Sequence, residues 1–140
     1  MRTKLDRILL IDDDEATNFL HQLIIEKMDI ANDLVVKEDG EEAIEYLTTK
    51  KDARYPTPDL ILLDINMPKM NGWEFLESYK DLSEEQRGEN IIIMLSASLN
   101  PDDMNKAKEI TLIKDFKNKP LTEEEVKRII KKYFPYFVFD

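Results

Sequence analysis

The sequence predicts an α/β fold, a doubly wound sheet of five parallel strands that is covered by helices on both faces. Three short apolar runs, at residues 8–11, 60–63 and 91–95, have the length of strands and lack alternating polar residues. Such runs are typical of strands buried on both faces. Segments with helical periodicity separate them, and strands that alternate with helices favour crossover connections and a parallel sheet.

The first half of the chain supplies two strands and two helices. Residues 8–11 form the first strand, and residues 34–36 are a weaker candidate of the same kind. Between them lies an apolar stripe at helical spacing, which predicts an amphipathic helix. Its members are Ala16, Phe19, Leu20, Leu23, Ile24 and Met28. A second helix follows Gly40, where the helical spacing continues to Leu47.

The second half repeats the alternation, with strands at residues 60–63, 91–95 and, more weakly, 112–113. A helix follows Gly72, and apolar residues at helical spacing extend from residue 126 to residue 134. The order strand, helix therefore occurs five times along the chain.

Two helix starts are marked by capping residues. Asn100 precedes Pro101, and proline is favoured at the first helical position. Thr122 and Glu125 have the spacing of a capping box, in which each side chain satisfies a free backbone amide.

The last helix is expected to stop near Phe134, because Pro135 cannot continue its hydrogen bonding. The tail at residues 136–139 holds three aromatic residues. Either it folds back onto the protein, or it contacts a kinase or a second copy in a homodimer, since exposed apolar clusters generally find a partner.

Composition limits the classes of function. The chain has 140 residues, 42% of them hydrophobic and 36% charged, and we expect a single domain over residues 1–140. The absence of cysteine excludes disulfides and thiol nucleophiles, and it fits a cytoplasmic protein. A net charge of -10 argues against nucleic-acid binding. Neither a signal peptide nor a membrane span is present in the sequence.

Polar residues follow four of the strand candidates. Residues 12–14 are three aspartates, Asp64 and Ser96 end two further strands, and Lys119 follows the last strand. Ligands of such sheets bind beyond the carboxyl ends of the strands. Two carboxylates ~5 Å apart repel by roughly 3 kcal/mol at an effective dielectric of ~20. Magnesium prefers oxygen ligands and relieves this repulsion, and the lysine offers a fixed positive charge to an anion.

These segments resemble the receiver domain of bacterial response regulators over essentially the whole chain. Residues 59–72 are similar to the phosphoacceptor segment of that family, and residues 8–13 to its first strand with an acidic pair. Residues 94–97 resemble its switch strand, and Lys119 with Pro120 its lysine–proline step. The resemblance implies a flavodoxin-like sheet with strand order 2-1-3-4-5.

The resemblance also implies the residues of a phosphorylation site. Asp64 would accept the phosphoryl group. Asp13, Asp64 and the main-chain carbonyl of Asn66 would ligate Mg²⁺, and Asp12 would act mainly through a metal-bound water. Lys119 would pair with the phosphoryl group.

The switch residues follow from the same resemblance. Ser96, next to Ala97, would reposition its hydroxyl onto the phosphoryl group, and Phe116 would be an aromatic switch that turns inward. The Lys119–Pro120 peptide bond would be cis. Serine stands at residue 96 where threonine is usual in the family.

A signalling function is thereby implied. The phosphoryl donor would be a phosphohistidine on a sensor histidine kinase or a histidine phosphotransfer protein, and the output a downstream protein target. The domain would not be an enzyme in the usual sense, because it catalyses only its own phosphorylation and dephosphorylation. Neither nucleic acid nor membrane is expected as a partner.

Three alternatives remain open at this point. Residues 12–14 also fit the opening motif of a haloacid-dehalogenase-like phosphatase that uses Asp12, although an acidic pair after Lys119 and room for a cap domain are missing. A module that has lost phosphorylation is the second. His21 is the third: we interpret it as a surface histidine, with a phosphohistidine as the alternative.

Overall fold

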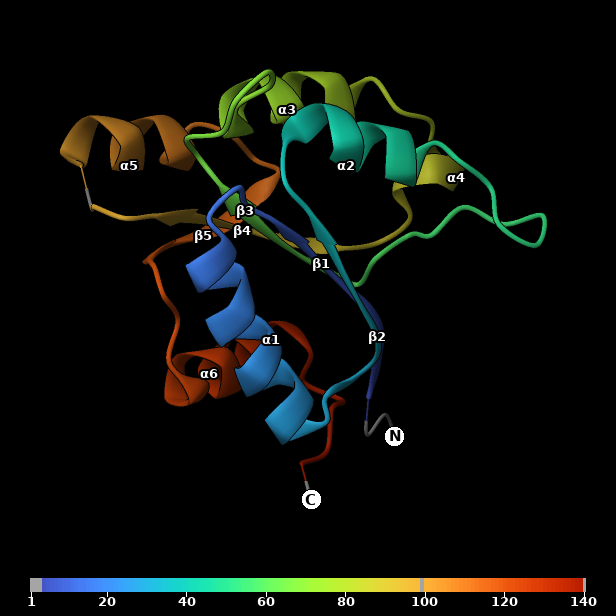
Figure 1. Ribbon diagram of the computed structural model, residues 1–140, viewed down its shortest axis with the longest axis vertical. Coiled ribbons are helices and arrows are strands. Elements are labelled where there is room, and N and C mark those ends of the chain that lie inside the picture. The colour runs from blue at the N-terminus through green and yellow to red at the C-terminus, as the bar shows by residue number, and fades with distance from the viewer. Residues whose placement is uncertain (1–3, 99, 140) are drawn as a thin grey trace.

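The computed structural model, which describes residues 4–98 and 100–139, contains one parallel sheet of five strands in the order β2-β1-β3-β4-β5 (Figure 1). The expected fold class and strand order are confirmed. The strands are β1 (Leu5–Ile11), β2 (Ala31–Lys37), β3 (Leu60–Asp64), β4 (Ile91–Ser96) and β5 (Ile113–Asn118).

Helices cover both faces of the sheet. One face carries α1 (Glu15–Met28) and α6 (Glu123–Tyr133), as Figure 1 shows below the sheet. The opposite face carries α2 (Gly40–Leu47), α3 (Gly72–Lys80), α4 (Glu84–Arg87) and α5 (Pro101–Lys108). The short α4 was not expected from the sequence, because one turn is too short to show helical periodicity. A capping box between Ser83 and Gln86 marks its start.

Two hydrophobic clusters sandwich the sheet, and successive strand residues alternate between them. Leu10 and Leu62 belong to the cluster under α1 and α6, whereas Leu9 and Ile61 belong to the one under α2 and α3. This arrangement explains the unbroken apolar runs in the sequence, because both faces of each central strand are covered. The expected capping box of Thr122 and Glu125 is confirmed, and so is the start of α5 at Pro101 with Asn100 as its cap.

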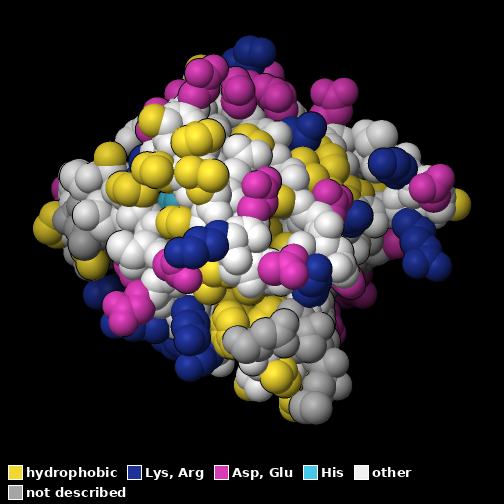
Figure 2. Space-filling model, turned by 60° about the horizontal axis from the view of Figure 1, so that its bottom comes forward, with side chains coloured by type: hydrophobic (Ala, Val, Ile, Leu, Met, Phe, Trp, Pro, Cys, Tyr) yellow, Lys and Arg dark blue, Asp and Glu magenta, His cyan; other side chains and the backbone are white. Residues whose placement is uncertain are grey.

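The orientation of α1 corrects two expectations. Part of its apolar stripe faces solvent, since Phe19 is 61%, Leu20 44% and Leu23 49% exposed. The interpretation of His21 as a surface histidine is wrong, because its side chain is only 2% exposed. On the N-terminal half of α1, the inward face instead bonds to buried main-chain groups of neighbouring loops, which requires polar side chains. Figure 2 shows the hydrophobic side chains gathered beside the small visible part of the histidine.

The C-terminal tail folds back onto the protein. The last helix, α6, ends at Tyr133 with Phe134 as its cap, as Pro135 predicts. Phe137 and Phe139 pack against the hydrophobic cluster under α6, with ring centroids 4.8 Å apart. Tyr136, by contrast, is 80% exposed.

Candidate functional site

Three aspartates converge at the carboxyl ends of β1 and β3. These strands are parallel neighbours, with Ile11 opposite Leu63, so the residues that follow them meet at one edge of the sheet. Asp12, Asp13 and Asp64 each place a carboxylate oxygen within 4.8 Å of the other two. Asp12 and Asp64 are buried, whereas Asp13 is exposed. The structure thus brings together three of the expected site residues.

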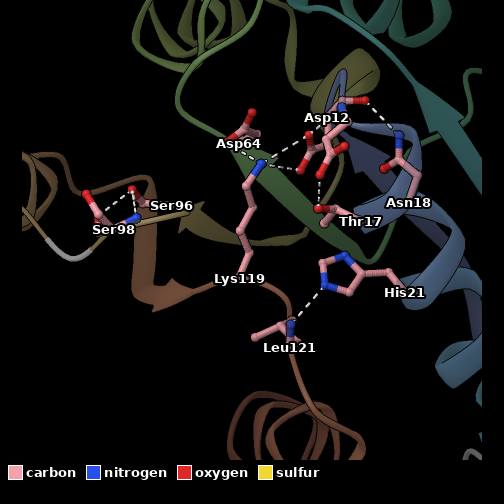
Figure 3. A network of polar contacts seen from close by, with 10 residues as sticks. Asp12, Thr17, Asn18, His21, Asp64, Ser96, Ser98, Lys119 and Leu121 are labelled. Carbon is pink, nitrogen blue, oxygen red and sulfur yellow. Dashed lines mark hydrogen bonds and ion pairs between the residues drawn. The ribbon is translucent and has the colours of Figure 1, made fainter.

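Lys119 follows β5, and its side chain extends to Asp12 and Asp64 (Figure 3). Its Nζ lies 3.0 Å from Oδ2 of Asp12 and 3.1 Å from Oδ1 of Asp64, and its side chain is only 10% exposed. The backbone N–H of Lys119 donates to the carbonyl of Ser96 at 2.9 Å. The Lys119–Pro120 peptide bond is cis, as the resemblance implies.

One ammonium group thus faces two buried carboxylates. Burial, followed by the negative charge of Asp12, raises the pKa of Asp64 to about 6, against the lowering effect of Lys119. Burial alone would lower the pKa of Lys119, but its hydrogen bonds and charge interactions with Asp12 and Asp64 raise it. The raised pKa of Asp64 shows that the pocket has an excess of negative charge. A hard divalent cation would neutralise this excess.

Neighbouring side chains fix the loop at residues 12–14. The backbone N–H of Asp14 donates to Oδ1 of Asp12 at 2.9 Å. The side-chain amide of Asn18 donates to the main-chain carbonyl of Asp12 at 2.8 Å. Thr17 donates its hydroxyl proton to the carboxylate of Asp14, and this bond lowers the pKa of Asp14.

The segment after Asp64 passes close to the strand that precedes it. The N–H of Gly72 donates to the carbonyl of Ile65 at 2.7 Å. A Cβ atom at residue 72 would lie 2.5 Å from the carbonyl oxygen of Asp64, so only glycine fits there without displacing the backbone of the site. Asn66, two residues after Asp64, is exposed.

The expected switch residues lie apart from the carboxylates. The hydroxyl of Ser96 donates to the carbonyl of Ser98, and the N–H of Ser98 donates back to Oγ of Ser96 at 3.2 Å. Figure 3 shows both serines pointing away from Asp64. Ala97 is exposed, and Phe116 is half-buried against the cluster under α3.

The sequence reasoning missed three polar residues of α1 that support the site. Thr17, Asn18 and His21 are 6%, 5% and 2% exposed, and they lie on the inward face of the helix. Nε2 of His21 accepts a hydrogen bond from the backbone N–H of Leu121 at 2.9 Å. The sequence did contain a signal for them. Residues 17, 18 and 21 are one, three and four positions apart, so on a helix they share one face, away from Phe19 and Leu23.

Residues 8–131 match the sequence profile of the response regulator receiver domain. The chain belongs to this family. A crystal structure of a two-component response regulator from Cytophaga hutchinsonii is similar in fold, with a TM-score of 0.79 and 32% identity over 94% of this chain and 98% of that one. The phosphatase alternative loses its support, because the receiver profile matches residues 8–131 and the strand order is the one expected for a receiver.

Curated relatives include two regulators from microorganisms. The probable methanogenesis regulatory protein FilR2 of Methanothrix harundinacea is 28% identical over 94% of this chain and 83% of its own length. Response regulator Rcp1 of a Synechocystis strain is 34% identical over 69% of this chain and 65% of its own length. The chain spans about half of some longer relatives, such as 47% of PhoP from Bacillus subtilis.

Two structural neighbours carry a metal ion or a phosphoryl group. One is the manganese-bound form of Rcp1, with a TM-score of 0.75 and 26% identity over 96% of this chain and 99% of that one. The other is the phosphorylated cyanobacterial phytochrome regulator RcpA, with a TM-score of 0.75 and 27% identity over 96% and 98% of the two chains.

Family membership gives the general role of this receiver domain. Receiver domains act in two-component signalling, bind a divalent metal ion in an acidic pocket and interact with histidine kinases or phosphotransfer proteins. Within residues 4–98 and 100–139, no helix has both the length and the apolar character needed to cross a membrane.

Proposed function

We propose that Asp64 of this receiver domain accepts a phosphoryl group from a phosphohistidine on a sensor kinase or a phosphotransfer protein, with Mg²⁺ as the metal cofactor. The observation that supports this most directly is the environment of the Asp64 carboxylate. It is buried among two further aspartates and lies 3.1 Å from the ammonium of Lys119. The phosphorylated relative RcpA supports the same chemistry.

The donor set fits a magnesium ion. Asp13 and Asp64 would ligate it directly with the main-chain carbonyl of Asn66, and Asp12 would act through a bound water. All of these ligands are oxygen atoms, and Mg²⁺ usually keeps several waters beside one or two carboxylates. When bound, the ion would supply positive charge to the phosphoryl oxygens. The manganese-bound relative Rcp1 supports a divalent ion at such a site.

The residues of the chain carry out the transfer. An oxygen of the Asp64 carboxylate attacks phosphorus in line, the P–N bond of the phosphohistidine breaks, and its electron pair goes to the imidazole nitrogen. The product is an acyl phosphate on Asp64. Lys119 already lies beside Asp64, and its ammonium would pair with the phosphoryl oxygens as their charge shifts.

Phosphorylation would then switch a protein-binding surface. The new group adds roughly two negative charges beside Asp64. The hydroxyl of Ser96 would exchange the carbonyl of Ser98 for a phosphoryl oxygen, and Ala97 would move with it. Phe116 would turn inward and change the surface formed by α5, β5 and α6, where a downstream protein binds.

The surface of α1 supports a protein as the phosphoryl donor. Phe19, Leu20 and Leu23 are exposed on a helix that begins at Glu15, directly after the acidic loop. A donor that binds this apolar surface would hold its phosphohistidine near Asp64. The net charge of -10 favours a protein partner over nucleic acid, and we expect the receiver to act in the cytoplasm.

Incubation with acetyl phosphate and Mg²⁺ tests the acceptor. The parent protein should gain one phosphoryl group by intact-mass measurement, and Asp64→Asn should gain none. Asp52→Asn, in the exposed turn after α2, is the matched control and should behave like the parent. Undiminished labelling of Asp64→Asn would overturn the assignment.

A further inference from the structure

The N-terminal half of the inward face of α1 is polar, where a helix over a sheet is normally apolar, and only Ile25 further along continues the hydrophobic cluster. Burying an amide or an imidazole costs free energy unless the group finds a hydrogen-bond partner. Asn18 and His21 are both buried, and each bonds to the main chain of a loop that holds a site residue. Figure 3 shows them on the same helix, Asn18 beside Asp12 and His21 joined to Leu121.

The bond from Leu121 defines the state of His21. A backbone N–H can only donate, so Nε2 of His21 must be unprotonated and the ring proton must lie on Nδ1. Burial lowers the pKa of His21, and the nearby positive charge of Lys119 adds to this effect against the opposing charge of Asp12. The neutral Nδ1–H form agrees with both observations.

This bond fixes one end of the turn that carries Lys119. The other end is fixed by the bond from the Lys119 N–H to the carbonyl of Ser96, at 2.9 Å. The side chain of Leu121 is only 2% exposed in the hydrophobic cluster under α6. Without His21, the Leu121 N–H would be a buried donor with its partner removed, and the turn could move to satisfy it.

Asn18 fixes the opposite half of the site. Its amide nitrogen donates to the carbonyl of Asp12, and this bond determines which way the amide faces. Its Oδ1 is buried and has no hydrogen-bond partner among the described residues. The side chain is therefore held by the Asp12 loop even though half of its hydrogen-bonding capacity is unused.

We propose that His21 and Asn18 are positioning residues of the phosphorylation site, His21 for the turn that carries Lys119 and Asn18 for the aspartate loop. This inference rests on the proposed function. Neither residue touches the phosphoryl group or the metal ion. His21 sets the place of the ammonium and therefore the rate of transfer. Asn18 sets the place of Asp12 and Asp13 and therefore the affinity for Mg²⁺.

Paired substitutions separate these roles from general effects on stability. His21→Phe keeps a ring of similar shape but removes the acceptor, whereas His21→Gln offers a carbonyl oxygen that can accept the Leu121 N–H. We expect His21→Phe to slow phosphorylation by phosphoramidate about tenfold without weakening Mg²⁺ binding in titration calorimetry, and His21→Gln to recover most of the rate. Asn18→Leu should weaken Mg²⁺ binding about fivefold.

The expected results differ between the two positions: substitution of His21 changes the phosphorylation rate, and substitution of Asn18 changes the affinity for Mg²⁺. A general loss of stability would instead lower both the rate and the affinity in every variant. The inference fails if His21→Phe phosphorylates at the parental rate, if His21→Gln is as slow as His21→Phe, or if Asn18→Leu binds Mg²⁺ like the parent. Nitrogen NMR of the parent gives a test that needs no variant. It should show His21 protonated at Nδ1 and bare at Nε2 at neutral pH, and the reverse tautomer would overturn the assignment.

Failure of the proposed function would give a different result. The parent itself would then take no phosphoryl group, while the His21 tautomer and the effect of Asn18→Leu on metal binding could still be measured.

Discussion

At the scale of single residues, the site depends on an imbalance of charge around Asp64. Two buried carboxylates share the ammonium of Lys119, and the exposed Asp13 lies close by. Either a bound cation or a proton on Asp64 relieves the repulsion between the carboxylates. The same imbalance makes the pocket attractive to a metal ion.

The titration of Asp64 gives a prediction with a defined sign. Its pKa in the folded protein is raised from 3.8 to about 6, first by burial and then by Asp12. The folded state therefore binds more protons than the unfolded state between these values, and the contribution of Asp64 to the free energy of unfolding falls as the pH rises through about 6.

Carbon NMR of the Asp64 carboxyl group should follow this titration in metal-free protein, and Mg²⁺ should move it to lower pH because the ion favours the charged form. A carboxyl group that titrates near its ordinary value of 3.8 without metal would contradict the account.

At the scale of elements, α1 has two faces with different tasks. Its inward face holds Asp12 and Leu121 through Asn18 and His21, and its outward face presents Phe19 and nearby leucines to solvent. The β1–α1 connection places both faces next to the acidic pocket. The helix therefore joins the proposed phosphorylation site to an exposed apolar surface that a protein donor can contact.

Substitution of the outward face should separate protein donors from small ones. Leu23→Ser should slow transfer from a phosphorylated histidine phosphotransfer protein by at least about fivefold, because an apolar contact is lost. Its rate with acetyl phosphate should stay parental, and its free energy of unfolding should change by less than about 0.5 kcal/mol, because the side chain is exposed. Glu26→Gln, on an exposed position of the same helix, is the control. Equal slowing with both donors would refute the role of this surface.

The tail after α6 makes a prediction of its own. Truncation after Pro135 removes Phe137 and Phe139 from the hydrophobic cluster they cover, and should lower the free energy of unfolding by roughly 2 kcal/mol. Light scattering should show the same oligomeric state before and after truncation. A truncated protein of parental stability that no longer dimerises would show instead that the tail serves a partner.

At the scale of the whole molecule, the parallel sheet brings residues together that lie far apart in the chain. Lys119 and Asp12 are 107 positions apart, yet their side chains meet because β1 and β5 end at the same edge of one sheet. A metal ion bound at this edge would therefore stabilise the whole fold through residues that belong to separate strands.

Millimolar Mg²⁺ should raise the thermal midpoint of unfolding, because only the folded state assembles the three aspartates. The shift should be a few degrees, and Asp13→Asn should reduce it by at least about half, since one direct ligand loses its charge. Asp33→Asn, at a distant exposed carboxylate paired with Arg7, should keep the parental response. A midpoint that does not respond to Mg²⁺ in the parent would exclude this ion at the pocket.

The sequence was sufficient for β1, β3 and β4 and for the acidic cluster, but not for the extent of β2 and β5 or for the orientation of α1. The candidate at residues 112–113 shares only Ile113 with β5, whose polar residues hide it from a search for apolar runs. In an α/β fold, an unbroken apolar run such as residues 60–63 indicates a strand that is buried on both faces. The residues that follow such parallel strands lie at the same edge of the sheet. Hydrophobic periodicity identified α1 as a helix, yet it could not predict that this helix turns Phe19 outward. The deciding partners were the carbonyl of Asp12 and the N–H of Leu121, and only the folded backbone places them under the helix.

The direct test of the central claim is to locate the phosphoryl group on the chain. After phosphorylation by a phosphohistidine donor in the presence of Mg²⁺, borohydride reduction converts an acyl phosphate on aspartate into homoserine, which tandem mass spectrometry identifies by position. The account predicts homoserine at residue 64 and at no other aspartate. Homoserine at residue 12 or 13, or phosphate that stays on His21, would contradict it.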